Sequence, residues 1–290
     1  MIITKLIGGL GNQMFQYAAG RRAAHFNNTL LKLDITGYEK QTGITPREYM
    51  LHIFNIQENF SSINEINGLK NNSFIRKVFR KINPFFQNNS YIKEKYFHFD
   101  PSILNIGDNS YLEGYWVSEK YFKDIENVIR KEFTFKNKPD VVNKKTINRI
   151  RNCESISIHI RRGDYVSDPK TNQFHGVCDL NYYHQAIKYM TSKITNPYFF
   201  FFSDDPKWCK ANLRLEYPTI YISHNLGKKD YEDMRLMSEC QHNIIANSSF
   251  SWWGAWLNQN KNKIVIAPKK WFRDESIDTN DIIPESWSKI

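Results

Sequence analysis

The sequence predicts an α/β protein whose two halves each contain a parallel β-sheet. The chain has 290 residues, which is enough for two domains of ordinary size. Residues 2–33 have the pattern strand, glycine turn, helix and strand, and five short apolar strands alternate with helices after residue 151. This alternation is typical of parallel strands joined by right-handed crossovers. A polar, basic stretch at 136–151 separates the halves, so we place the domains at 1–150 and 151–290.

The N-terminal half begins with a strand at 2–7, a turn at 8–11, a helix at 12–26 and a strand at 30–33. Glycines between a strand and a helix let a ligand approach backbone N–H groups. The dinucleotide fingerprint is incomplete, because Met14 stands where its third glycine would be. An ordinary glycine turn and a ligand loop both fit. Gly11 and Asn12 are the candidate contacts, since the pair Asn12-Gln13 has no evident structural need.

Between residues 35 and 150 the pattern is less regular. A helix predicted at 73–82 carries four basic residues on one face and apolar residues on the other. Such a helix lies either on an anionic membrane surface or on the protein's own core. A further strand is predicted at 111–117, before the connection at 136–151.

The clearest strand of the second half is 155–161, where three isoleucines alternate with polar residues. It runs into Arg161, Arg162 and, two residues later, Asp164. In open α/β sheets, ligands bind beyond the carboxyl ends of the strands. A guanidinium offers a planar fork of donors that suits diphosphate oxygens. Taken alone, these residues fit either an anion site or a surface salt bridge.

Two further polar loops follow the strands predicted at 198–202 and 243–246. The first loop contains Asp204 and Asp205, whose carboxylates can accept hydrogen bonds from the N1–H and exocyclic amine of guanine. The second loop supplies Asn247, Ser248, Ser249, Phe250 and Ser251. Hydroxyl and N–H groups at a helix start suit phosphate oxygens, although each loop alone also fits a helix cap. Three such loops at equivalent strand ends predict a nucleotide-diphosphate pocket in the second half.

We expect this pocket to work without a metal. No two aspartates are separated by a single residue, and the histidines show no metal-ligand spacing. Arginine and the helix dipole would then neutralise a leaving diphosphate. His159 lies on the same strand face as Arg161 and is a further candidate contact. The tryptophans of 252–256 favour core packing over stacking on a ligand.

The net charge of +10 lies mostly in the first half, with +8 in residues 1–150 and +2 in 151–290. A polyanion partner, a membrane surface and a basic overall composition each account for it. Because the charge is not concentrated near the strand-end loops, we expect no nucleic-acid partner. The sequence shows no signal peptide, no apolar span and no C-x-x-C pair. We therefore expect a cytoplasmic protein, in peripheral contact with the inner membrane if helix 73–82 binds it.

Four segments resemble glycosyltransferase family 11, whose bacterial members are α-1,2-fucosyltransferases. They are His159-Ile160-Arg161-Arg162-Gly163-Asp164-Tyr165 and the segments 8–18, 202–206 and 247–254, in the same order over nearly the whole chain. The resemblance implies a GT-B fold, in which two Rossmann-like domains with parallel sheets face a central cleft. It implies GDP-β-L-fucose as donor and inverting, metal-independent transfer to O2 of a terminal β-galactoside. A role in O-antigen or other surface-glycan synthesis, with a lipid-linked acceptor, follows from the same resemblance.

The resemblance also implies roles for individual residues. Arg161, with Arg162 beside it, would contact the diphosphate. His159 and either Asp204 or Asp205 would contact the guanosine, and Ser249 to Ser251 the phosphate oxygens. Asn12 would face the fucose or the acceptor, and Asp164 is a candidate base that could instead hold an arginine. The alternatives are a GDP-fucose-dependent transferase of another linkage (α-1,6), a basic RNA-binding protein and a non-catalytic nucleotide-binding protein.

Overall fold

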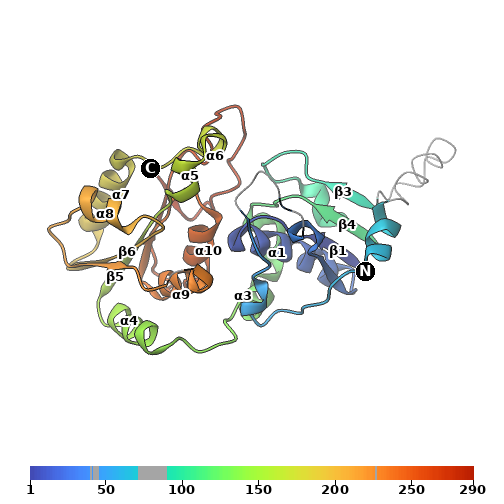
Figure 1. The fold of residues 1–290 in the computed structure, drawn as a ribbon, viewed down its shortest axis with the longest axis horizontal. Coiled ribbons are helices and arrows are strands. Elements are labelled where there is room, and N and C mark those ends of the chain that lie inside the picture. Colours follow the sequence, from blue (N-terminus) through green and yellow to red (C-terminus); the bar gives the residue numbers. More distant parts are fainter. Residues whose placement is uncertain (40, 42–45, 71–89, 226) are drawn as a thin grey trace. The chain divides into compact units, whose positions relative to one another are not determined.

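The computed structural model describes residues 1–39, 41, 46–70, 90–225 and 227–290, which form two compact units (Figure 1). The first unit comprises Met1–Lys136 and Asn280–Ile282, and the second comprises Asn137–Thr279 and Ile283–Ile290. The basic helix predicted at 73–82 lies outside the described residues.

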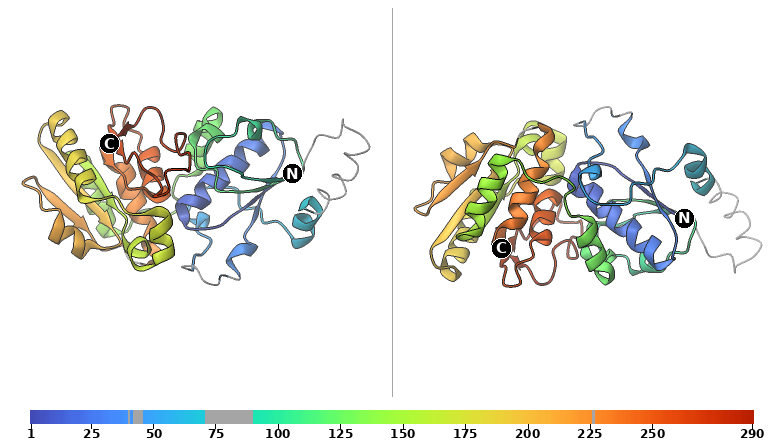
Figure 2. Two further views of the ribbon diagram at one scale, coloured as in Figure 1. Left: turned by 90° about the horizontal axis from the view of Figure 1, so that it is seen from above. Right: turned by 90° about the horizontal axis from the view of Figure 1, so that it is seen from below.

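The first unit is built on a four-stranded parallel sheet in the order β2-β1-β4-β3. Its strands are β1 (Ile2–Lys5), β2 (Leu31–Asp34), β3 (Tyr91–Lys93) and β4 (Ser110–Glu113). Helix α1 (Leu10–Phe26) lies along this sheet (Figure 2). Gly20 permits the close approach, because a Cβ there would come within 2.9 Å of the Thr4 and Leu31 side chains. The unit also contains a helix at 63–70, α3 (Glu126–Glu132) and the 3₁₀ turns η1 (Thr36–Tyr38), η2 (Leu51–Ile53), η3 (Pro101–Asn105), η4 (Glu119–Tyr121) and η5 (Lys123–Ile125).

Strand β4 ends at Glu113, although the sequence pattern continues to residue 117. The half-buried carboxyl of Glu94 accepts hydrogen bonds from the backbone N–H groups of Tyr115 and Trp116, at 2.6 and 2.9 Å. Trp116 has a φ of 56°, in the left-handed region that non-glycine residues rarely occupy. The chain therefore turns away from the sheet immediately after Glu113.

The pair Asn12-Gln13 includes a structural residue, contrary to the sequence interpretation. Gln13 is fully buried. Its amide nitrogen donates to the carbonyls of Gly8 and Glu48, at 3.0 and 2.8 Å, and its amide oxygen accepts from Met50 N–H at 2.9 Å. Gln13 ties the glycine turn to residues 48–50, a long-range partner that no local pattern reveals.

The second unit contains a six-stranded parallel sheet in the order β10-β9-β8-β5-β6-β7. Its strands are β5 (Glu154–Ile160), β6 (Pro197–Ser203), β7 (Thr219–Ile222), β8 (His242–Ile244), β9 (Val265–Ala267) and β10 (Ser288–Lys289). The strand order reverses between β5 and β8, as in doubly wound Rossmann-like sheets. The predicted α/β class with two parallel sheets is confirmed.

Helices cover both faces of this sheet (Figure 2). They are α4 (Val141–Arg151), α5 (Gly163–Ser167), α6 (Pro169–His175), α7 (Leu180–Lys193), α8 (Pro206–Asn212), η6 (Gly227–Lys229), α9 (Tyr231–Glu239) and α10 (Ser249–Leu257). The isoleucines of β5 pack with α7 and α8 in one hydrophobic core. On the other face, Asn243 of β8 bonds both Ser157 and the Met237 carbonyl of α9. Trp252 and Trp253 are fully buried, which confirms their predicted core role.

The division between the units falls at residues 136/137, whereas the sequence places it at 150/151. The predicted connection contains helix α4, whose sequence is mostly polar. Asp140 caps the helix by accepting from Asn143 N–H at 2.9 Å, and α4 packs against β5 and α9. Ile147 and Ile150 of α4 are buried, and the helix belongs to the second unit.

Candidate active site

The three polar loops predicted to form a pocket follow adjacent strands. Strand β5 lies between β6 and β8, and all three are parallel. Because parallel strands end at the same edge of a sheet, the loops at 161–164, 204–205 and 247–251 lie side by side. The reversal of strand order between β5 and β8 is also where open α/β sheets bind ligands.

Arg161 follows β5 directly and is held by two carboxylates. Its guanidinium donates to Asp164 Oδ1 at 2.5 Å and lies 2.8 Å from Asp204 Oδ2. It also lies 5.3 Å from the centroid of the Tyr165 ring. A guanidinium carries five N–H donors, so these ion pairs fix its plane and leave donors for an anionic ligand. The salt bridge that competed with an anion site in the sequence interpretation is present, and it orients the arginine.

Arg162 is held in the same way by the loop after β6. Its backbone N–H donates to Asp204 Oδ1 at 2.9 Å, and its Nε lies 3.3 Å from Asp205 Oδ2. Its guanidinium stacks over Trp208, 4.0 Å from the ring centroid. Asp205 Oδ1 also caps α8 by accepting from Trp208 N–H at 3.1 Å. Both aspartates that we expected to contact guanosine are thus engaged within the protein.

Gly163 makes room for the Asp204 carboxylate, since a Cβ there would lie 2.6 Å from Asp204 Oδ2. We expect Gly163→Ala to displace Asp204 from Arg161 and to lower kcat/KM by roughly tenfold to a hundredfold, because a small misplacement of a positioned group has such effects. The measurement is steady-state kinetics of the transfer reaction that the family resemblance implies. Gly68→Ala is the control, because a Cβ at Gly68 meets nothing within 4 Å. Equal activity of both variants would show that the position of Asp204 does not matter.

His159 is buried on the face of β5 that meets α10. Its ring centroid lies 5.8 Å from that of Phe250. Burial, together with the charge of Arg161, lowers the pKa of His159 to about 3, so its imidazole is neutral. Its Nδ1 has no hydrogen-bond partner among the described residues. A buried nitrogen without a hydrogen-bond partner is unusual in a folded protein, and it marks His159 as a residue whose role the internal packing does not explain.

The segment 247–251 divides into a structural part and a helix start. The Asn247 amide donates to the carbonyls of His175, Gly176 and Trp271, at 3.0, 3.4 and 3.1 Å. Ser248 precedes α10, and Ser249, Phe250 and Ser251 form its first turn rather than a loop. Ser251 Oγ is buried and donates to the Ser248 carbonyl at 3.2 Å. This turn contains no acidic residue, so its N–H groups suit an anion.

The remaining predicted residues, Gly11 and Asn12, lie in the first unit. They form the first turn of α1, beyond the carboxyl end of β1. Asn12 N–H donates to the Gly9 carbonyl at 3.0 Å. Gly8 has a φ of 76°, and a Cβ there would lie 2.7 Å from Asn12 Nδ2. The glycine turn therefore holds the Asn12 side chain against its own backbone.

Asp233 is a carboxyl that the sequence reading missed. It lies in the first turn of α9, which packs beside α10, and both helices start at the carboxyl edge of the sheet. Burial, with smaller contributions from Asp230 and Glu232, raises the pKa of Asp233 to about 7. Asn225 Nδ2 donates to Asp233 Oδ1 at 2.8 Å. The acidic run 230–233 is an available signal, but it does not distinguish a buried carboxyl from a solvated one.

His175 is a second residue that the sequence reading missed. Its ring stacks on Tyr165, with centroids 4.7 Å apart and planes at 12°. Burial lowers the pKa of His175, and its Nδ1 lacks a hydrogen-bond partner within the described part of the chain. Since Tyr165 contacts Arg161, His175 belongs to the surroundings of the arginine site.

No group of three His, Cys, Asp or Glu side chains is placed to hold a metal ion within the ranges that the structure describes. No helix in those ranges is long and apolar enough to span a membrane.

Curated proteins from Escherichia coli resemble the chain over its full length. An α-1,2-colitosyltransferase is 36% identical over 304 residues, covering 100% of this chain and 99% of that protein. The O-antigen biosynthesis glycosyltransferase WbnK is 35% identical over 310 residues, covering 98% and 99% of the two chains. The galactoside alpha-(1,2)-fucosyltransferase 2 of Sus scrofa is 26% identical over 176 residues, covering 58% of this chain and 50% of that protein.

The fold is also shared with a solved fucosyltransferase structure. A variant of FUT1 from Arabidopsis thaliana, in complex with GDP, superposes with a TM-score of 0.51 at 13% identity, covering 93% of this chain and 71% of that one. This likeness and the two parallel sheets identify the fold as GT-B. The family model "Glycosyl transferase family 11" matches residues 1–290. The chain belongs to glycosyltransferase family 11.

Proposed function

We propose that the protein transfers L-fucose from GDP-β-L-fucose to O2 of a terminal β-galactoside, with inversion and without a metal. The observation that carries this proposal is Arg161, whose guanidinium is oriented by two carboxylates at the reversal of strand order. The first turn of α10 lies beside it and offers N–H groups. Both suit a diphosphate, and the names of the bacterial and mammalian relatives supply the sugar class and the linkage.

Charge movement explains why such a site promotes the reaction. As the bond between fucose C1 and the diphosphate breaks, negative charge gathers on the leaving phosphate oxygens. Fixed donors aimed at that charge stabilise the transition state more than the ground state. Arg161 can supply these donors without reorganising, since Asp164 and Asp204 already hold it.

Asp164, a candidate base in the sequence analysis, is engaged by Arg161 in the structure. Asp164 Oδ1 accepts from Arg161, so we assign Asp164 a positioning role. We propose that departure of GDP leads the reaction and that the acceptor hydroxyl loses its proton to water late, after its oxygen has begun to bond to the sugar carbon. A strong base is not required on such a path, because the sugar carbon is already electron-deficient when the oxygen attacks.

We also propose that Asp233 recognises guanine, because Asp204 and Asp205 are engaged by arginines. Asp233 has one identified amide partner, Asn225, and starts a helix adjacent to α10. Guanine donates two parallel N–H groups, which match a carboxylate. Hypoxanthine lacks the exocyclic amine and would lose one of these bonds.

Recognition by Asp233 predicts a pH dependence. The charged carboxylate accepts both guanine donors, and its pKa is raised to about 7. Affinity for GDP-fucose should therefore be full above pH 7 and fall as the pH drops below it. Asp233→Asn should remove this dependence and abolish a preference for GDP over IDP that we expect to be roughly tenfold. Titration calorimetry across pH 5.5 to 8.5 measures both (roughly the range spanning that pKa). If Asp233→Asn still prefers GDP over IDP, guanine recognition would be assigned to Asp204 or Asp205 instead.

A second candidate donor follows from the 36% identity to the colitosyltransferase. Colitose is L-fucose without the hydroxyl on C3. A site that hydrogen-bonds this hydroxyl rejects the analogue strongly, whereas a site without such a bond accepts both. Competition between the two GDP-sugars for one β-galactoside acceptor decides between them. Methylation analysis of the product separates the α-1,2 linkage from an α-1,6 linkage.

A further inference from the structure

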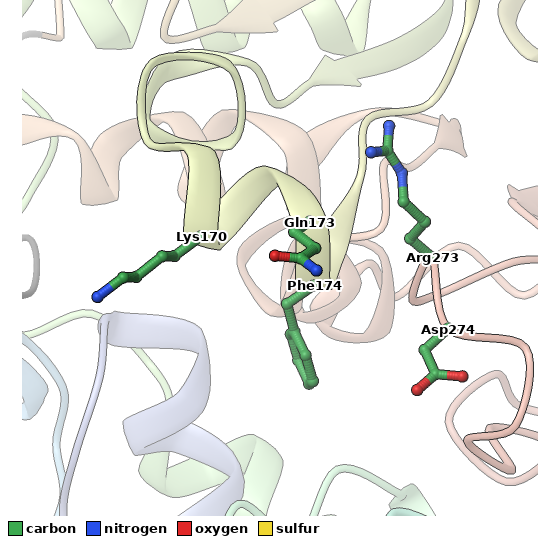
Figure 3. A pocket seen from close by; sticks show the side chains of 5 residues that line it. All are labelled: Lys170, Gln173, Phe174, Arg273 and Asp274. Atoms are coloured by element: carbon green, nitrogen blue, oxygen red, sulfur yellow. The ribbon is translucent and has the colours of Figure 1, made fainter.

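A pocket of about 470 Å³ lies at the same sheet edge as the arginine site and is lined by Lys170, Gln173, Phe174, Arg273 and Asp274 (Figure 3). The first three residues belong to α6, which comes after β5. The other two lie in the segment after β9. Neither the three polar loops nor the proposed guanine contact uses this pocket.

The two walls of the pocket are tied together by hydrogen bonds. Arg273 N–H donates to the Phe174 carbonyl at 3.0 Å. The Asn247 amide donates to the carbonyls of His175, next to Phe174, and of Trp271, two residues before Arg273. Asn247 is buried, so these bonds are shielded from water. The pocket is therefore a fixed feature of the second unit.

Phe174 presents a fixed apolar surface to this pocket. Its side chain is 39% exposed. The ring is nevertheless braced by Phe272, with centroids 4.8 Å apart, and by the edge of His175, also at 4.8 Å. In Figure 3 the Gln173 and Phe174 side chains lie at the end of α6, with Asp274 across from the Phe174 ring. An exposed aromatic ring held by its neighbours can bind a flat ligand at little cost in conformational entropy.

Successive ring contacts connect this pocket to Arg161. The guanidinium lies 5.3 Å from the Tyr165 ring, which stacks on His175 at 4.7 Å. His175 in turn contacts Phe174 at 4.8 Å. The pocket is therefore joined to the arginine site by two adjoining rings, those of Tyr165 and His175.

We propose that the pocket binds a pyranose ring of the oligosaccharide acceptor, beyond the galactose that receives the new sugar. A pyranose has an apolar C–H face, which packs on an aromatic ring such as Phe174. Its hydroxyls both donate and accept, which suits the Gln173 amide and the Asp274 carboxylate. The proposal rests on the proposed function, because it takes the arginine site as the place of transfer.

The test compares a short and a long acceptor. Wild type should show a lower KM for a tetrasaccharide ending in β-galactose than for methyl β-galactoside. Phe174→Ala should raise the KM for the tetrasaccharide roughly five- to tenfold and leave the KM values for methyl β-galactoside and GDP-fucose unchanged. Tyr217→Ala is the matched control. Tyr217 is 40% exposed, packs on Phe199 and precedes β7, at the opposite edge of the sheet.

Gln173→Ala is a second test in case Phe174→Ala folds poorly. It removes only an exposed amide and leaves the ring packing intact. It should raise the same KM without changing the melting temperature. Wild-type KM values for the tetrasaccharide in both variants would overturn the proposal, as would equal KM values of wild type for the two acceptors. If wild type transfers fucose to neither acceptor, the proposed function fails instead. Ligand-observed NMR of tetrasaccharide binding to wild type and Phe174→Ala then decides the pocket's role separately.

Discussion

Arg161→Ala should reduce fucosyl transfer by roughly a thousandfold, since removing one fixed donor from a transition-state charge costs about that much. The variant also leaves Asp164 and Asp204 without their shared cation, beside the site proposed for a diphosphate. Like charges would repel there, so the loss should fall on kcat as well as on donor KM. Arg161→Lys should recover little, because one ammonium cannot bridge both carboxylates in the planar geometry of a guanidinium.

Arg149→Ala is the matched control for this variant. Arg149 also lies over a tyrosine ring, 5.1 Å from the centroid of Tyr198, but it belongs to the last turns of α4. Tyr198 lies near the start of β6, away from the carboxyl edge of the sheet. The control should retain wild-type kinetics. Normal turnover in Arg161→Ala would refute the role assigned to this arginine.

Asn247→Ala should destabilise the protein by about 3 kcal/mol, because it leaves buried backbone carbonyls without their donor. The residue is 3% exposed and serves three of them. The melting temperature should fall by roughly 5–10 °C. Thermal unfolding followed by circular dichroism measures the change.

Asn262→Ala provides the comparison, since Asn262 is exposed. Its melting temperature should stay within about 2 °C of wild type, as is usual for surface substitutions. The structural role of Asn247 also predicts that the folded Asn247→Ala variant binds GDP-fucose with nearly unchanged affinity. If Asn247→Ala instead lost much of its affinity for GDP-fucose while keeping wild-type stability, Asn247 would contact the donor directly, as predicted from the sequence.

Strand–helix alternation was sufficient to predict how the second unit gathers its polar loops. Parallel strands end at one edge, so the loops after β5, β6 and β8 had to share it once those strands were adjacent. The partners within each loop could not be predicted in the same way. Which oxygen of Asp204 holds Arg161, and that Asp205 caps α8, depend on side-chain geometry that the order of residues does not encode.

Features that arise from tertiary packing could not be predicted from the sequence. Helix α4 is mostly polar, so its sequence resembles a linker. In the structure its two isoleucines are buried, and the helix belongs to the second unit. Burial raises the pKa of Asp233. The sequence does not indicate this burial, because Asp233 stands among other acidic residues that are typical of an exposed segment. Gln13 shows no evident structural need in the sequence, because two of its backbone partners lie 35 and 37 residues away. For α4 and Gln13 the decisive partner is remote along the chain.

The most direct test incubates the protein with GDP-β-L-fucose and lactose, with and without EDTA, and identifies the product by NMR. We predict 2′-fucosyllactose with an α-linkage, formed at the same rate in both samples and lost in Arg161→Ala. A different linkage, a rate that collapses in EDTA and returns with a divalent cation, or full activity in Arg161→Ala would contradict it.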